Sequence, residues 1–213
     1  MVKKHMPSPV GHALSGVAAA WVADLVPGRR TGRTAAPSSS LFARAGGRLT
    51  LICGVLAAAP DLDLFLGRHR IVTHSVGALV VVSIIASLVT RQVTRKVKSR
   101  KFKVQSVVRV TLMCAAAYGS HLLLDWLGVD TSAPHGLAVL WPFSDTSYIS
   151  GLDLFRSTER RAIFSLATLR INLIAMSYEA AVMLPVLGLL WLVRVKALAG
   201  LATEAARRHH APQ

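Results

Sequence analysis

The chain has 213 residues, of which 53% are hydrophobic and 16% are charged, with a mean hydropathy of +0.48. This composition excludes a disordered chain and argues against a soluble domain, which carries about a quarter charged residues. Two cysteines are too few for a disulfide scaffold. The 25 basic and 10 acidic residues leave a net charge of +15. Because the apolar residues stand in long uncharged blocks, the composition is typical of a small membrane protein with charges in its loops.

Five blocks almost free of charged residues predict membrane-spanning helices. The two longest reach the roughly 20 residues that cross a hydrocarbon core of about 30 Å. The three shorter blocks carry polar residues at one end, as a membrane-embedded polar site requires. We therefore predict an all-α fold, a polytopic helical bundle of about five spans with a polar metal site at one membrane face. A single domain is expected over residues 1–200, followed by a disordered tail at 201–213. The blocks are 10–23, 49–60, 71–90, 110–124 and 171–193.

The basic residues predict which side of the membrane each loop faces. Two loops, at 28–48 and 91–105, contain basic but no acidic residues. Together with Arg109 and the chain after residue 193, they hold 17 of the 25 basic residues. The positive-inside rule makes these segments cytoplasmic, so the N-terminus is expected outside and the C-terminus inside. A cleaved signal peptide is the alternative interpretation of the first block, because Lys3 and Lys4 precede it.

Two of the loops carry further predictions. The basic residues of 91–103 lie next to a span and suffice to bind anionic lipid head groups. Nucleic-acid binding is not expected, because Phe102 is the only aromatic side chain there that can stack on bases. The long loop 128–170 is expected outside, with an interfacial amphipathic helix over 156–170.

With five spans, seven ionisable side chains reach the same, extracytoplasmic level. Each one alone can be explained as a helix cap, a turn residue or a hydrogen-bonding partner. Ionisable residues at membrane depth are costly, however, and are functional by default. Imidazoles and carboxylates together are typical of a zinc, iron or manganese site. The candidate metal ligands are His12, Asp61, Asp63, His69, His74, His121 and Asp125.

The local sequence around five residues supports more detailed predictions. His121 and Asp125 are four residues apart, so a helix presents both on one face. Cys53 and Cys114 lie in apolar runs and are predicted to be small core residues rather than ligands. Glu179, a charged residue within the last block, is expected to pair with a buried polar group such as Tyr118 or with a basic residue.

The order of five short motifs resembles that of the YdjM-like family. The motifs are GH at 11–12, PDLD at 60–63, HRIVTHS at 69–75, SHLLLD at 120–125 and GLAVLWP at 136–142. This family comprises bacterial inner-membrane proteins described as predicted membrane-bound metal-dependent hydrolases. The resemblance covers about two thirds of the chain. It implies a location in the bacterial inner (cytoplasmic) membrane and a metal-dependent hydrolase activity.

A more distant likeness concerns the chemistry. The order His, Asp, His and then HxxxD is similar to that of zinc-dependent phospholipase C and the related single-strand nucleases, which cleave phosphodiesters at a trinuclear zinc cluster. This sequence lacks their processed N-terminal Trp, and His135 has no acidic residue four positions later. One or two ions are therefore expected, with Asp125 able to bridge them. The implied ligands are His12, Asp61, His74 or His69, His121 and Asp125.

The expected reaction is hydrolysis at the extracytoplasmic face by a metal-activated water, since a bound metal lowers the pKa of water from 15.7 toward about 7. Asp63, if it is not a ligand, is the candidate acceptor of the water proton. Arg70 is the candidate cation for a phosphate oxygen. The expected substrate is a phosphoester or phospholipid-like molecule in the membrane. The alternatives are a metal or proton transporter, since buried His and Asp also mark ion paths, and a non-catalytic membrane protein with a structural metal site.

Overall fold

The computed structural model describes residues 7–25, 45–66, 71–130, 135–159, 162 and 164–209. These residues form five α-helices and one short 3₁₀ helix, and they contain no β-strand, only two isolated bridges. The predicted all-α fold is confirmed.

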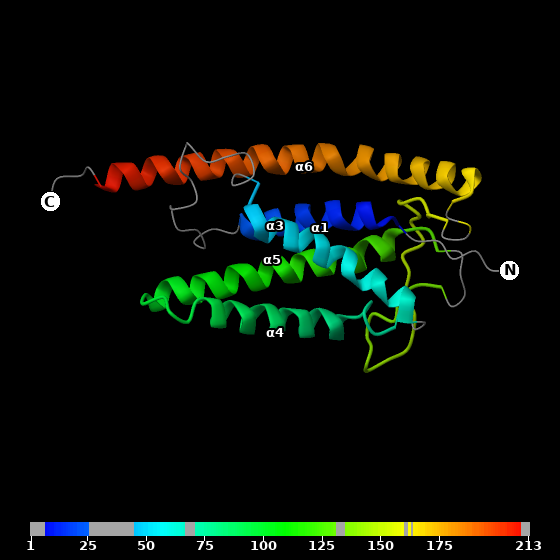
Figure 1. Cartoon of the computed structure of the whole chain (residues 1–213), viewed down its shortest axis with the longest axis horizontal. Coiled ribbons are helices and arrows are strands. Elements are labelled where there is room, and N and C mark those ends of the chain that lie inside the picture. The colour runs from blue at the N-terminus through cyan, green and yellow to red at the C-terminus, as the bar shows by residue number, and fades with distance from the viewer. Residues whose placement is uncertain are drawn as a thin grey trace.

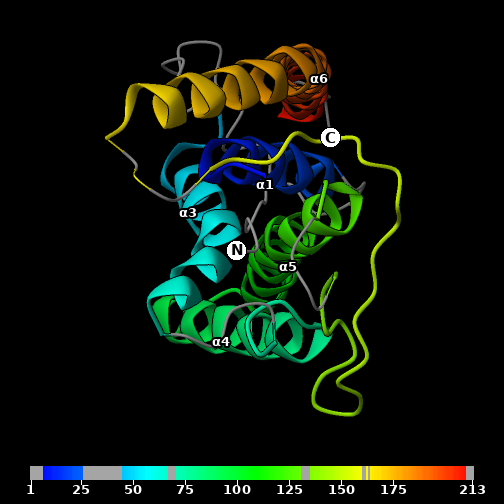
Figure 2. The same ribbon diagram turned by 90° about the vertical axis from the view of Figure 1, so that its right-hand side faces the viewer.

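Helix α1 is the central element of the bundle. It spans Pro9–Asp24 and packs against α3 (Gly47–Ala58), α5 (Arg100–Leu127) and α6 (Leu166–His209). Figure 2 shows α1 among these three helices, with α4 (Val76–Val93) lying along α5 on the side away from α6. Because α1 is surrounded, its interior positions are set by contacts with three different helices.

Small residues allow these helices to approach closely. A Cβ atom at Gly16 of α1 would overlap the Cβ of Ala57 on α3 and lie 3.0 Å from the carbonyl oxygen of Cys53. Small residues at such contacts are typical of helices that associate in membranes, where burial of apolar side chains gives little driving force. Cys53 and Cys114 are buried free thiols in the core cluster with Ala57, as predicted.

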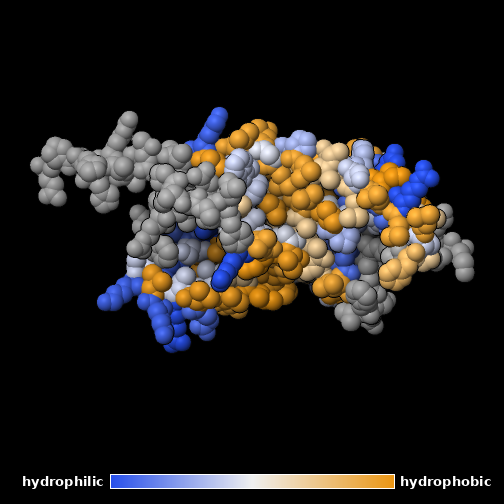
Figure 3. Space-filling model, turned by 45° about the horizontal axis from the view of Figure 1, so that its top comes forward, coloured by the Kyte–Doolittle hydropathy of each residue, from blue (hydrophilic) through white to orange (hydrophobic). Residues whose placement is uncertain are grey.

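Within the described ranges, three helices are long and apolar enough to cross a bilayer: Val76–Val93, Lys103–Leu127 and Leu166–Ala197. Helices α1 and α3 occupy two of the predicted blocks but have 16 and 12 residues, and at 1.5 Å per residue they are roughly 24 and 18 Å long. The face seen in Figure 3 has a broad apolar area in the middle, with hydrophilic residues toward both ends. The bundle is therefore that of a membrane protein, and five passes remain a prediction.

The last helix differs from the sequence prediction at both ends. It continues to His209, so the segment 201–213, expected as a disordered tail, begins as helix. Its Ala, Leu, Glu and Arg residues are strong helix formers. At the other end the predicted amphipathic helix over 156–170 is wrong, because α6 begins only at Leu166. Hydrogen bonds join the Glu159 backbone to the Asn172 side chain and hold the preceding segment along α6 instead.

The two predicted basic loops agree with the structure only in part, or lie partly outside the residues that it describes. The loop predicted at 91–105 is mostly the ends of α4 and α5, with a short turn at 94–99 between them. Most of the loop predicted at 28–48 lies outside the described residues. The 3₁₀ helix η2 (Ala59–Leu66) follows α3 and reaches the end of the bundle where α1 begins and α5 ends (Figure 1).

Candidate metal centre

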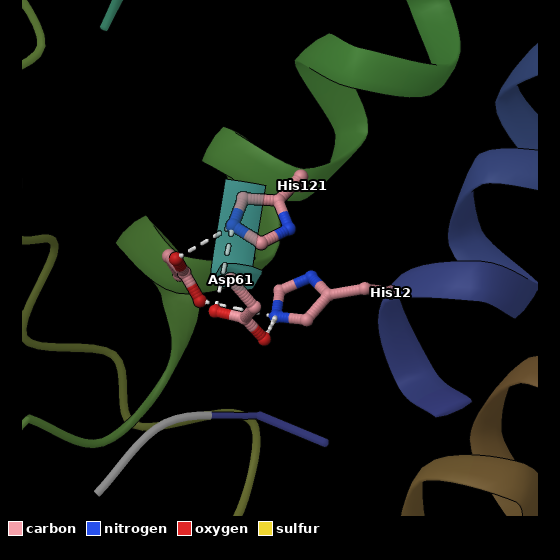
Figure 4. A group of neighbouring side chains, drawn as sticks. His12, Asp61 and His121 are labelled. Atoms are coloured by element: carbon pink, nitrogen blue, oxygen red, sulfur yellow. Dashed lines mark ion pairs between the residues drawn. The ribbon is translucent and has the colours of Figure 1, made fainter. Parts of the chain in front are cut away.

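Five buried side chains converge at this end of the bundle. One comes from α1, one from η2, one from the turn before α4 and two from α5. The three imidazoles are 0% exposed and the two carboxylates 6%. Figure 4 shows the side chains from α1, η2 and α5 pointing toward one another. The five residues are His12, Asp61, His74, His121 and Asp125.

Helix caps set the direction of two of these side chains. The Ser8 hydroxyl caps α1 by accepting the N–H of Gly11 at 3.1 Å, so His12 lies in the first turn of the helix. The Ser75 hydroxyl caps α4 in the same way, and His74 is the residue just before this cap. The helical spacing places His121 and Asp125 on one face of α5, as predicted.

Asp125 is at the middle of the cluster. Its Oδ1 lies 3.2 Å from Nε2 of His12, and its Oδ2 lies 3.3 Å from Nε2 of His74 and 3.2 Å from Nε2 of His121. The Nε2 atoms of His74 and His121 are 3.0 Å apart. The Asp61 carboxylate lies 3.8 to 4.0 Å from the same three nitrogens. All five side chains therefore face one small volume.

Hydrogen bonds on the outer side of the rings fix which nitrogen faces this volume. Nδ1 of His121 donates to the carbonyl oxygen of Ala57 at 2.7 Å, because a carbonyl can only accept. Nδ1 of His74 lies 3.0 Å from the Thr73 hydroxyl, which itself donates to Asp63, so this Nδ1 also carries a proton. Both Nε2 atoms are thus left to bind a cation. This arrangement is typical of histidines that ligate metals.

The atoms that face the centre are nitrogen and carboxylate oxygen atoms that a bound cation would compensate. Among the described residues, neither ring nitrogen of His12 and neither oxygen of Asp125 makes a hydrogen bond. Buried polar atoms without partners are costly. Two atoms bound to one tetrahedral zinc at about 2.0–2.1 Å lie roughly 3.3 Å apart, close to the spacings measured here. The four ligand atoms of His12, Asp61, His121 and Asp125 all lie within 4.8 Å of one another. These residues therefore fit a divalent ion.

The electrostatics favour positive charge at the same place. Burial alone lowers the pKa of His74, but the carboxylates of Asp125, Asp61 and Asp63 outweigh burial and raise it to about 10. Burial alone raises the pKa of Asp61, whereas the neighbouring imidazoles of His74, His12 and His121 hold it below its ordinary value. The centre therefore stabilises a cation, either a proton on His74 or a metal ion.

The remaining predicted site residues are placed differently. His69 and Arg70 lie outside the described residues. Asp63 is buried and lies 3.3 Å from Nδ1 of His74, across the ring from Nε2. It therefore contacts the outer side of a candidate ligand rather than the centre itself.

Glu179 is the functional candidate whose actual partner sequence reasoning did not identify. Its carboxylate is fully buried and accepts hydrogen bonds from the backbone N–H and the hydroxyl of Ser8. Tyr118, the partner suggested from the sequence, instead donates to the carbonyl oxygen of Thr73. The unusual charge in an apolar block was the available signal. Its partner could not be read from the sequence, because Ser8 is 171 positions away.

A second buried charged group lies at the opposite end of α1. Asp24 is 1% exposed and contacts Nε of Arg109 at 2.6 Å and Nη1 of Arg194 at 2.8 Å. The Arg194 guanidinium also lies over the Trp21 ring, 5.9 Å from its centroid. This group joins α1, α5 and α6 far from the metal centre.

An all-helical bundle with long apolar helices and a buried His/Asp centre defines a membrane protein with a candidate metal site. The chain belongs to the YdjM inner membrane protein family, whose sequence profile matches residues 6–202. The resemblance to this family is thereby confirmed over most of the chain. No curated protein and no solved structure matches the chain. The likeness to zinc-dependent phospholipase C stays a resemblance in residue order.

Proposed function

We propose that this protein is a membrane-bound metal-dependent hydrolase that cleaves a phosphoester of a lipid-like substrate at the extracytoplasmic face. The observation that most supports this proposal is the convergence of three Nε2 atoms and two carboxylates on one buried volume. Hydrolases use such mixed nitrogen and oxygen ligand sets to hold zinc, with manganese or iron as the other candidates.

Each of the five residues has a proposed role as a ligand. His12, His121, Asp61 and Asp125 form the most compact set, and His74 is the fifth member because its Nε2 lies 3.3 Å from Asp125. The two oxygens of Asp125 face different imidazoles, which suits either one ion or a carboxylate that bridges two. When bound, the ion supplies Lewis acidity, which lowers the pKa of water to about 7.

Asp63 lies on the outer side of the His74 ring, where its carboxylate orients the ring and stabilises positive charge on it. It accepts the Thr73 hydroxyl and faces Nδ1 of His74, which holds that ring with Nε2 toward the centre. The same contact stabilises positive charge on the ring. We assign Asp63 this orienting and charge-stabilising role.

A cavity lined by the segment after α5 and by α6 suits a substrate with both a phosphate and apolar chains. Its volume is about 270 Å³, and its lining includes Arg156 and Ser157 as well as the apolar side chains of Ile171, Ile174 and Ala175 on α6. Val129, another lining residue, is four positions after Asp125, so the two Cα atoms are within about 14 Å. A guanidinium recognises phosphate oxygens, and the apolar wall suits acyl chains. We therefore propose Arg156 as a second candidate for binding the phosphate, beside Arg70, which lies outside the described residues.

The proposed orientation in the membrane keeps the metal centre outside. The basic turn between α4 and α5 lies at one end of the bundle and the metal centre at the other (Figure 1). Positive residues favour the cytoplasmic side, so the N-terminus is outside and the C-terminus inside. The basic segment 91–103 then contacts anionic lipid head groups of the inner leaflet.

Transport is less well supported by the arrangement of polar groups. A transport path for metal ions or protons requires ionisable residues through the bundle. Between the centre and the Asp24 end, α1 packs on Ala57, Met113 and Ala117, all 0% exposed. These apolar contacts separate the His/Asp centre from the buried Asp24 group, so the two groups of ionisable residues do not form one continuous path.

The proposal is tested on the full chain purified in detergent. Metal content and the hydrolysis of bis(p-nitrophenyl) phosphate and phosphatidylglycerol are measured for wild type, His121→Ala and the control His135→Ala, whose ring is exposed in the outer loop. We expect a bound transition metal and activity in wild type and the control, and the loss of both in His121→Ala. A protein that binds no metal, or a His121→Ala variant with full activity, refutes the proposal. Bound metal with no hydrolysis of any phosphoester favours a structural site.

A further inference from the structure

Glu179 is a buried carboxylate within a helix that is otherwise apolar at this depth. It is 0% exposed, and block 171–193 contains no other charged residue. A charged or polar group in such surroundings is costly unless partners compensate it. Its retention therefore calls for a specific interaction, and the metal centre as described does not use it.

The partners of Glu179 all belong to the beginning of α1. One oxygen accepts the backbone N–H of Ser8 at 2.8 Å, and the other accepts the Ser8 hydroxyl. The same hydroxyl accepts the N–H of Gly11 at 3.1 Å. A Cβ atom at Gly11 would lie only 2.5 Å from the carboxylate, so the absence of a side chain there makes room for it. The carboxylate thus sits against the first turn, where helix N–H groups lack partners and the macrodipole favours negative charge.

This first turn carries His12. The backbone N–H of His12 donates to the Ser8 carbonyl oxygen at 3.1 Å. Its ring, stacked on His121 at 3.9 Å between centroids, makes no hydrogen bond with the described residues. Unlike His74 and His121, His12 therefore has no hydrogen bond of its own that orients the ring. Apart from the stacking on His121 and the 3.2 Å contact of its Nε2 with Asp125, the direction of the ring depends on the backbone of α1.

We infer that Glu179 is a positioning residue, which acts through Ser8 to hold the first turn of α1 so that Nε2 of His12 reaches the metal centre. This inference rests on the proposed metal site. In this way α6 contributes to the position of His12, a candidate ligand that belongs to α1. This positioning role also accounts for the presence of a buried carboxylate within the apolar part of α6.

Asp24 offers a matched control at the other end of the same helix. It is also a buried carboxylate, and it also ties α1 to α6, through Arg194. It is 12 residues from His12, or about 18 Å along the helix. A purely structural role predicts similar effects for Glu179 and Asp24, whereas positioning predicts an effect on metal binding from Glu179 alone.

The experiment measures Zn²⁺ and Co²⁺ affinity and the Co²⁺ absorption spectrum of the full chain in detergent. We expect Glu179→Ala to weaken metal binding by roughly 10- to 100-fold, as loss of a residue that orients a ligand does, and to alter the spectrum. Glu179→Gln should stay within about threefold of wild type, because its amide can still accept from the Ser8 N–H and contact the hydroxyl. Asp24→Asn should lower thermal stability without changing metal affinity. If Glu179→Ala does not fold, Glu179→Asp, one methylene shorter, replaces it with the same expectation.

A double-mutant cycle with His12→Ala shows whether Glu179 acts through His12. In the His12→Ala background, Glu179→Ala should weaken metal binding further by less than about threefold. An equal loss in both backgrounds, wild-type affinity in Glu179→Ala, or an equal loss in Asp24→Asn overturns the inference. Wild-type protein that binds no metal overturns the metal centre and the inference together. Metal binding with the expected cycle but no hydrolysis refutes only the proposed activity.

Discussion

Asp125→Asn removes one negative charge from the middle of the centre while keeping the shape of the side chain. The carboxylate lies 3.2 to 3.3 Å from three imidazole nitrogens, so an ion held by those nitrogens is within about 4 Å of it. Two unit charges at that distance interact by about 4 kcal/mol at an effective dielectric constant of 20. We therefore expect the dissociation constant for Zn²⁺ to rise about a thousandfold.

Thermal unfolding in detergent measures this change directly. Zn²⁺ at a hundred times the wild-type dissociation constant should stabilise wild type by about 2.7 kcal/mol, which raises the unfolding temperature by roughly 5–10 °C for a chain of this size. The same concentration should leave Asp125→Asn unshifted. Asp145→Asn, which changes an exposed carboxylate between α5 and α6, is the control and should respond like wild type. An undiminished Zn²⁺ shift in Asp125→Asn would refute the placement of Asp125 as a ligand.

Three further predictions concern pH, packing and topology. Because the pKa of His74 is raised from 6.5 to about 10 in the folded state, its protonation stabilises the metal-free protein. With a chelator present, the stabilisation by protonated His74 should be complete below about pH 6.5 and should be lost as the pH rises through 10. Unfolding temperatures that do not fall between these two pH values would contradict the prediction. Gly16→Val places a side chain where Ala57 lies and should cost about 1–3 kcal/mol of unfolding free energy, whereas Gly188→Ala, with open space around it, should cost little. A cysteine introduced at Lys98, with the native thiols buried, should not react with an impermeant reagent added to intact cells, and labelling from outside reverses the proposed topology.

The resemblance and the helices could be predicted because their signals are local. Apolar blocks separated by charged residues give the approximate position of each helix, and the i, i+4 spacing of His121 and Asp125 places both on one face. The failed prediction at 156–170 had the same kind of support, from apolar residues at helical spacing. It was wrong for the residues before Leu166, because the Glu159 backbone bonds to the Asn172 side chain and the neighbouring Phe155 pairs with Gly128 after α5.

For the candidate site, the sequence indicated which residues take part, but the role of one of them depended on the tertiary structure. Imidazoles and carboxylates near the ends of predicted spans indicated a metal site and named all five converging residues. They did not separate Asp63 from the ligands, because its place on the outer side of His74 depends on the fold of η2 against the turn before α4.

By itself, the sequence determined that this is a helical membrane protein and which side chains have metal-binding chemistry, since composition, hydropathy and short spacing are properties of the chain alone. Only the tertiary structure decided which of these side chains meet and what holds them. The carbonyl oxygen of Ala57 selects the tautomer of His121 from 64 positions away, and Glu179 reaches Ser8 across 171 positions. Such contacts depend on how helices pack, and close packing among small residues is specified by the whole bundle rather than by any one segment.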